Sequence, residues 1–208
     1  MDIKTKKDLK DNFMTTSRIE TLVDGIFAIS MTLLVLNLDV PQLVSPTTNL
    51  IIIDYLISLI PKFYVYALSF ILLAVFWRIN HQAFHRIKRS NNIFSWINVM
   101  WLMFVALVPF STSLMGEYGE FQAATLFFHL NMLCIGILSL ISWRYAFKND
   151  LTTVKLTEKS YRNSIKMYMM FPIVCLVAIA LTFISPSWSS IAYMGTFLFK
   201  KIKDNNTD

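Results

Sequence analysis

The feature that most constrains this chain is a series of apolar runs, each near the length needed to cross a lipid bilayer. A membrane-spanning helix takes about 20 apolar residues, with a usual range of about 17 to 25. The sequence contains six such runs, at 19–39, 52–80, 93–115, 121–146, 164–185 and 187–202. Of the 208 residues, 55% are hydrophobic and only 15% are charged, which is more apolar surface than a soluble domain of this length can bury. We therefore expect an all-α, polytopic membrane protein with six transmembrane helices.

Two of the runs carry features that interrupt a simple helix. In the second run, Pro61 lies beside Lys62 and downstream of Asp54. Because proline breaks or kinks a helix interior, we expect the first turns of this run to lie at an interface or the helix to kink near Pro61. The sixth run is barely long enough to span and opens on Ser-Pro-Ser-Trp. The first run follows a lysine-rich stretch, but it is too long for a signal peptide and is kept as a mature helix.

Along the chain, the segments between the apolar runs alternate between those that contain basic residues and those that contain none. They occur in 1–18, 81–92 and 144–166 and at the C-terminus, whereas 39–52, 115–121 and 185–187 contain none. By the positive-inside rule, both termini are expected in the cytoplasm. The expected organisation is a single domain, 1–208, with a cytoplasmic segment at 1–18, a membrane bundle at 19–202 and a cytoplasmic tail at 203–208. Topology thus explains the net charge of +6, and no nucleic-acid partner is expected.

The first run carries a stripe of mixed chemistry. On a helical wheel, Ile29, Thr32, Leu33 and Leu36 follow the spacing i, i+3, i+4 and i+7 and share one side. Leucines at this spacing mostly pack helices together or face lipid, so the spacing alone does not identify a function.

Asp24 falls on a different side of the same helix and needs a partner, because ionisable groups at membrane depth rarely face lipid. The cytoplasmic end of the second helix offers Trp77, Asn80 and His81, followed by His85. A hydrogen-bonded cluster with Asp24 could fix the helix register or could relay protons, and we favour the structural role.

The first run resembles the first helix of the transmembrane protein 175 family, the lysosomal and prokaryotic potassium channels. The family signature is R-x-x-x-F-S-D followed by a pattern close to A-I-x-x-T-L-L-x-L. The matching residues here are Arg18, Asp24, Ala28-Ile29, Thr32-Leu33-Leu34 and Leu36, with Leu22-Val23 in place of Phe-Ser. The second helix resembles the family pattern W-x-x-x-H-x-x-x-H/R at Trp77, His81 and His85.

The resemblance implies a prokaryotic plasma-membrane channel, selective for potassium over sodium, without a pore-loop filter. It implies a homotetramer in the lipid bilayer with the first helix of each subunit around a central pore. The implied gate is Ile29, Leu33 and Leu36, the implied selectivity residue is Thr32, and a structural polar network would hold Arg18, Asp24, Trp77, Asn80 and His81. Rings of aliphatic side chains can gate by dewetting, and four hydroxyls could coordinate a partly dehydrated ion.

At the implied outer mouth lie Asn37 and Asp39. Four copies of Asp39 would concentrate cations there, although Asp39 can equally be a solvated loop residue. No cofactor is expected beyond the potassium ions in the pore.

Three other classes of protein remain as alternatives. An enzyme could use His81 and His85 as an H-x-x-x-H metal pair, but the chain has only three histidines and no nucleophile motif, so neither a catalytic nor a metal site is expected. A secondary transporter or a proton-permeable cation pathway is the second alternative, although no internal repeat is visible. A purely structural assembly subunit would conduct no ions.

Overall fold

A computed structural model of the chain describes residues 16–40, 48–152 and 158–195. These residues are helical almost throughout and include no β-strand; their one isolated β-bridge joins Ile87 and Thr152. The all-α fold expected from the apolar runs is therefore confirmed.

The elements follow in chain order, with η marking a 3₁₀ helix. They are α2 (Ser17–Leu33), η1 (Leu34–Asn37), α3 (Asn49–Ser58), α4 (Ile60–Phe84), α5 (Asn92–Ala106), α6 (Val108–Tyr118), α7 (Gln122–Lys148), α8 (Glu158–Thr182) and η2 (Pro186–Tyr193). The start of α5 shows how the local sequence sets a boundary: the Asn91 side chain accepts a hydrogen bond of 2.9 Å from the Phe94 amide.

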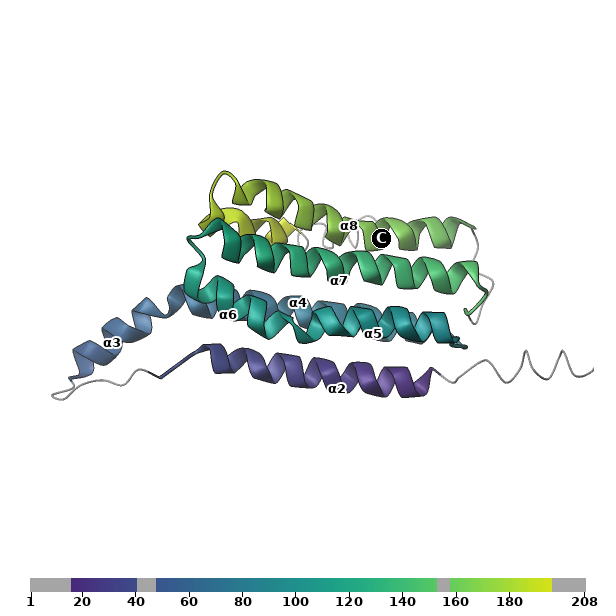
Figure 1. The fold of residues 1–208 in the computed structure, drawn as a ribbon, viewed down its shortest axis with the longest axis horizontal. Helices are drawn as coiled ribbons and strands as arrows, with labels where there is room; N and C mark the ends of the chain where they lie inside the picture. Colours follow the sequence, from purple (N-terminus) through teal and green to yellow (C-terminus); the bar gives the residue numbers. More distant parts are fainter. Residues whose placement is uncertain (1–15, 41–47, 153–157, 196–208) are drawn as a thin grey trace, which may run out of the picture.

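The helices lie side by side in a layered bundle (Figure 1). Helix α2 runs along one side, α8 and η2 run along the opposite side, and α4, α5, α6 and α7 lie between them. Helix α7 packs against α5, α6 and α8, and α2 packs against α4 and α5.

Aromatic side chains join the layers. The ring of Phe27 on α2 lies 5.4 Å from that of Trp101 on α5, and the rings of Phe76 on α4 and Phe171 on α8 meet edge to face at 4.6 Å. Between membrane helices such contacts stabilise through close packing, because lipid tails are as apolar as the side chains themselves.

The second apolar run is not one continuous span over 52–80, and in its bounds the prediction is wrong. The chain forms α3 and α4, separated at Leu59, with Pro61 in the first turn of α4. Proline is tolerated there because the amides of a first turn have no helical acceptor. Helix α3 projects from the bundle at an angle to α4, so the break expected near Pro61 is present (Figure 1).

Five helical stretches of the described chain are long and apolar enough to cross a bilayer. They are Ser17–Asn37, Ile60–Phe84, Asn92–Tyr118, Gln122–Lys148 and Ser160–Thr182. In the third stretch, α5 passes into α6 at Leu107, two residues before Pro109. Of the sixth predicted run, the described part begins as the 3₁₀ helix η2, and 196–202 lies outside the described residues. Six crossings therefore remain a prediction.

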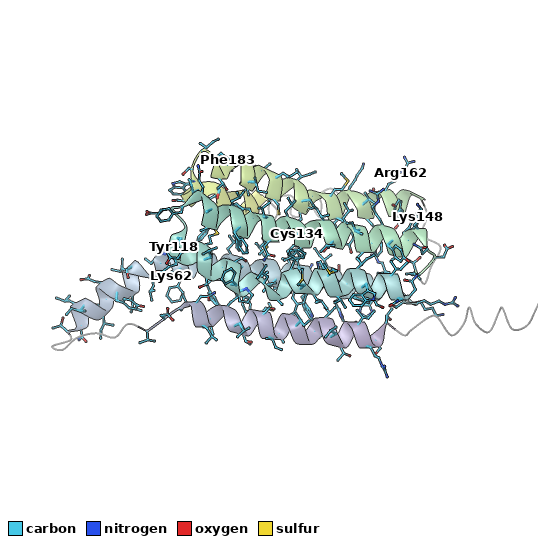
Figure 2. The ribbon with its side chains drawn as sticks, in the orientation of Figure 1. Lys62, Tyr118, Cys134, Lys148, Arg162 and Phe183 are labelled. Carbon is cyan, nitrogen blue, oxygen red and sulfur yellow. The ribbon has the colours of Figure 1, made fainter. Side chains whose placement is uncertain are left out.

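The two ends of the bundle differ in charge. Helix α2 begins, α4 and α7 end, and α8 begins at one end, which we call the basic end; it carries Lys148 and Arg162 (Figure 2). At the opposite end, Lys62 and Tyr118 lie close to each other in the view, and Lys62 forms a salt bridge with Glu117.

Candidate functional site

Helix α2 has one face inside the bundle and one face outside it. The side chains of Val23, Phe27, Ser30 and Leu34 are buried, each at most 2% exposed, against the neighbouring helices. Their spacing of three to four residues is that of one helix face. This buried face fixes the rotation of α2, and it therefore decides which residues the helix leaves uncovered.

The uncovered face holds the predicted stripe. Ile29 is 60% exposed, Leu33 is 42% exposed and Leu36 is 67% exposed, so none of the three packs inside the subunit. Small and hydroxyl-bearing residues are also exposed on this helix: Thr21, Gly25 and Ala28 precede Ile29, and Thr32 lies between Ile29 and Leu33. A methyl group added at Gly25 would meet no other atom within 4 Å. This face has no protein partner among the described residues of the chain.

The Thr32 hydroxyl is anchored to its own helix. It donates to the carbonyl oxygens of Ala28 and Ile29, each at 2.9 Å. A carbonyl can only accept, so the hydroxyl hydrogen is directed at the backbone. A threonine oxygen also has two acceptor lone pairs, and these remain available on the uncovered face.

Towards the basic end, polar side chains join α2 to α4. The indole Nε1 of Trp77 donates to Asp24 Oδ1 at 2.8 Å. One turn further along both helices, His81 Nδ1 lies 3.3 Å from Glu20 Oε1. His81 in turn contacts His85 through their Nε2 atoms at 3.1 Å. Since α2 and α4 run in opposite directions, each step of four residues keeps the two helices in register.

The Glu20–His81 contact is looser than its distance suggests. The two atoms are within ion-pair range, yet Nδ1 of His81 has no partner that satisfies hydrogen-bond geometry. The contact is therefore a weak one, because a misaligned donor forms a weak hydrogen bond. The contact becomes a salt bridge only when His81 is protonated. The ring of Trp77 stacks on that of His81 with centroids 5.6 Å apart, which holds the imidazole in place.

Two residues of the predicted network lie apart from this cluster. Arg18 is exposed at the start of α2 and contacts no charged partner among the described residues. The Asn80 side chain is half-buried, and its Oδ1 has no hydrogen-bond partner. Within this chain, therefore, the structure brings Asp24 together with Trp77 but not with Arg18 or Asn80.

At the opposite end of α2, the two predicted mouth residues face different surroundings. The Asn37 amide donates to the carbonyl of Pro109 at 3.2 Å, so this side chain ties η1 to α6. Asp39 is exposed, and its backbone carbonyl accepts a hydrogen bond of 2.5 Å from the Tyr55 hydroxyl of α3. Asn37 is uncharged, so of these two residues Asp39 alone carries a charge, and its side chain is exposed.

Two members of the cluster, Glu20 and His85, were not assigned a role from the sequence. A usable signal was present, since Glu20 and Asp24 are spaced by four residues, as are Trp77 and His81. Two such pairs on antiparallel helices meet only in the register that the structure shows, and the sequence alone does not specify that register.

The third histidine lies far from this cluster and is satisfied within the core. His129 Nδ1 lies 3.0 Å from the Tyr193 hydroxyl, and its Nε2 lies 2.8 Å from Ser189 Oγ. These bonds tie η2 to α7. The described residues contain no group of three or more histidine, cysteine or acidic side chains that could hold a metal ion.

Comparisons with known proteins relate this chain to a family. Residues 18–109 match the family described as the endosomal/lysosomal potassium channel TMEM175. A protein of Chamaesiphon minutus named as a potassium channel is 35% identical over 181 residues, which cover 85% of this chain and 88% of that protein. A potassium channel of Streptomyces collinus is 33% identical over 103 residues, covering 50% of this chain and 48% of its own length.

A solved structure agrees over nearly the whole chain. The crystal structure of a lysosomal potassium-selective channel TMEM175 homolog from Chamaesiphon minutus matches with a TM-score of 0.76 at 32% identity, covering 89% of this chain and 96% of that one. The family is one of ion channels, which confirms that an enzyme is the wrong class. By sequence and by fold, this chain belongs to the TMEM175 family.

Proposed function

We propose that this protein is a potassium channel in which α2 lines the ion path of a homotetramer in the plasma membrane. In this proposal each subunit crosses the membrane six times and both termini are cytoplasmic. Relatives named as potassium channels, one of them aligned over 85% of the chain, support the function. The structural support is the uncovered face of α2.

The chemistry of that face carries the proposal. Gly25, Ala28 and Thr32 form a row of small residues, and rows of small residues let membrane helices approach one another closely. A face that meets only lipid gains nothing from hydroxyls or from the missing side chain of Gly25. Four copies of α2 around a common axis would use both features. The small residues would let the helices pack tightly, and the hydroxyls would present polar atoms to an aqueous path.

The aliphatic residues of the same face are suited to a gate. Ile29, Leu33 and Leu36 are exposed on successive turns, so four subunits would form three stacked rings of branched side chains. A narrow aliphatic ring excludes water and thereby blocks ions without a charged barrier. The chain needs no separate gating domain for such a closed state.

Thr32 is the proposed selectivity residue. Its hydrogen points to the helix carbonyls, so the oxygen can only accept on the pore side. Four such oxygens would replace part of the hydration shell of a potassium ion. Sodium holds its water more tightly and would gain less from the exchange.

The test is ion flux through the purified, tetrameric protein in liposomes with potassium inside and sodium outside. We expect a current with a reversal potential shifted towards that of potassium. Thr32→Val should reduce the potassium-over-sodium preference several-fold, because valine keeps the shape and removes the oxygens. Thr182→Val is the matched control: the Thr182 hydroxyl makes the same type of bond, to Ala178 O at 3.0 Å, but is buried on α8.

Two outcomes would contradict the proposed channel, and a third would contradict only the role of Thr32. Folded tetramer without flux would point to an assembly subunit, and flux that requires a proton gradient would point to a secondary transporter. An unchanged reversal potential in Thr32→Val would remove the selectivity role while leaving the channel intact.

A further inference from the structure

A cavity away from α2 opens between α4, α7 and α8, near the basic end of the bundle. Its volume is about 410 Å³, within the range of about 300 to 1,000 Å³ that is typical of ligand sites. At about 100° per residue, the lining residues Ile79 and Gln82 of α4 lie roughly 200° and 140° from Trp77. The cavity and the α2 cluster therefore use different faces of α4.

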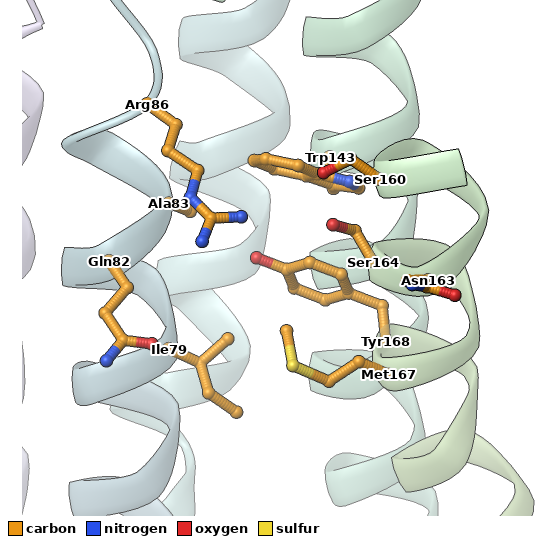
Figure 3. Close-up of a pocket in the computed structure, with 10 residues that line it drawn as sticks. All are labelled: Ile79, Gln82, Ala83, Arg86, Trp143, Ser160, Asn163, Ser164, Met167 and Tyr168. Atoms are coloured by element: carbon orange, nitrogen blue, oxygen red, sulfur yellow. The ribbon is translucent and has the colours of Figure 1, made fainter. Parts of the chain in front are cut away.

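The lining is polar at one end and apolar at the other (Figure 3). Arg86, Trp143 and Ser160 lie at the basic end, and Ile79 and Met167 lie towards the middle of the helices. Beyond them, the edge-to-face contact of Phe76 with Phe171 joins α4 to α8. The Ser164 and Tyr168 hydroxyls lie between the polar and apolar ends (Figure 3).

The polar atoms of the cavity are mostly donors or can act as donors. The Arg86 guanidinium and the Tyr168 hydroxyl point towards each other across the space (Figure 3). Arg86 has other interactions in the fold, but its five N–H groups leave it able to bind an anion as well. No acidic residue lines the cavity in the described part of the chain.

Trp143 contributes a buried N–H donor to the cavity wall. Its side chain lines the cavity and is only 3% exposed, yet its Nε1 has no hydrogen-bond partner among the described residues. In Figure 3 this nitrogen lies at the edge of the ring that faces α8. An indole N–H can only donate, and a buried donor without an acceptor is unfavourable. The ring itself is fixed, because it stacks on Tyr168 at 5.5 Å.

We propose that this cavity binds a phosphate group, the chemistry shared by anionic phospholipid head groups and soluble phosphate. Arg86 would form charge-assisted hydrogen bonds to the phosphate oxygens, and Trp143 Nε1 and the hydroxyls of Ser160 and Ser164 would donate further ones. The change from a polar to an apolar lining matches a lipid whose acyl chains follow Ile79 and Met167 towards the bilayer centre. The site is independent of the ion path.

The experiment is native mass spectrometry of the purified protein with added phosphatidylglycerol, repeated with inorganic phosphate as competitor. We expect Arg86→Gln to weaken phosphatidylglycerol binding by about tenfold or more. Trp143→Phe, which keeps a ring in the core and removes the donor, should cause a smaller loss. Lys148→Gln removes one positive charge at the same end of the bundle without touching the cavity, and it should bind as the wild type does.

The competitor separates the two sources of phosphate. Lipid that stays bound in millimolar phosphate identifies a head-group site, and lipid that phosphate displaces identifies a site for soluble phosphate; both outcomes support the proposal. Wild-type binding in Arg86→Gln and Trp143→Phe would overturn it. So would an equal loss in Lys148→Gln, or a loss in Arg86→Gln alone, since either would place the anion on the surface.

Discussion

Helices α2 and α8 form opposite sides of the same bundle and are nearly indistinguishable by hydropathy (Figure 1). The mean hydropathy of their most apolar windows is 1.9 and 2.0, and neither window is more than 22% buried. Their outer faces nevertheless differ. From Met169 to Ile184, the residues that α8 and its end expose are all apolar, whereas α2 exposes two threonines and a glycine among its aliphatic residues. Hydropathy identifies both as membrane helices, and the two differ in the residue types on their exposed faces, as the proposed ion path along α2 would require.

The largest expected effect comes from placing a carboxylate on each outer face. In a helix that faces lipid, an aspartate at the centre costs about 2.5 to 3.5 kcal/mol. We expect this loss for Val177→Asp on α8 and a clearly smaller one for Ala28→Asp on α2, because an aqueous path would hydrate the new charge. The amount of folded protein in size-exclusion chromatography and its melting temperature would measure both. Equal losses would mean that α2 faces lipid as α8 does.

A second difference between the two helices is how they are held. Helix α8 packs against α7 and η2, whereas α2 packs against α4 and α5 and also forms the Asp24–Trp77 hydrogen bond near its basic end. We expect Trp77→Phe to lower the stability by about 1.5 to 3 kcal/mol, because the carboxylate loses its donor. Thermal unfolding and the tetramer fraction would report it. Trp96→Phe is the control, since Trp96 is 62% exposed on α5 and its loss should change neither.

Much of the fold could be predicted from the sequence, because length and hydropathy define membrane helices. Pro61 correctly marked the break in the second run, although the helix ended at Ser58 and restarted at Ile60. The 3₁₀ geometry of η2 was not predicted. The Ser-Pro-Ser-Trp opening is visible in the sequence. The burial of Ser189 and Tyr193, however, depends on their contact with His129, about 60 positions earlier in the chain.

The candidate site was predictable in part, because helical spacing places Ile29, Thr32, Leu33 and Leu36 on one side of α2, whereas the exposure of that side is known only from the structure. The Glu20–His81 contact requires knowledge of the register between α2 and α4. The cavity beside Arg86 requires more, since it forms where α4, α7 and α8 meet, and Trp143 shows no unsatisfied donor until the fold is known.

Truncation of a large side chain tests the two outer faces again, with a smaller expected effect. Leu33→Ala should raise basal potassium flux by about tenfold, equivalent to about 1.4 kcal/mol of barrier, because a wider ring holds water more readily. Leu176→Ala on α8 is the matched control, since Leu176 is also exposed. Its flux should equal that of the wild type. A liposome flux assay on both variants decides, and an unchanged or lower flux in folded Leu33→Ala would argue against a gate at this ring.

The smallest expected effect lies at the end of α2, where Asp39 follows η1. If four copies surround the mouth, they raise the local cation concentration, and Asp39→Asn should lower the single-channel current by about twofold at low ionic strength. Near 0.1 M salt, where the screening length is about 10 Å, the difference should shrink, and near 1 M it should vanish.

Glu120→Gln supplies the comparison for this last change. Glu120 is also an exposed acid at the end of the bundle opposite the basic end, in the turn between α6 and α7. Its neutralisation should leave the current unchanged at every salt concentration, because only the end of α2 adjoins the proposed ion path. If both variants reduce the current equally, the effect is one of overall surface charge. If neither does, Asp39 is a solvated loop residue that contributes only its backbone carbonyl, by accepting the Tyr55 hydroxyl and holding α3 to the end of α2.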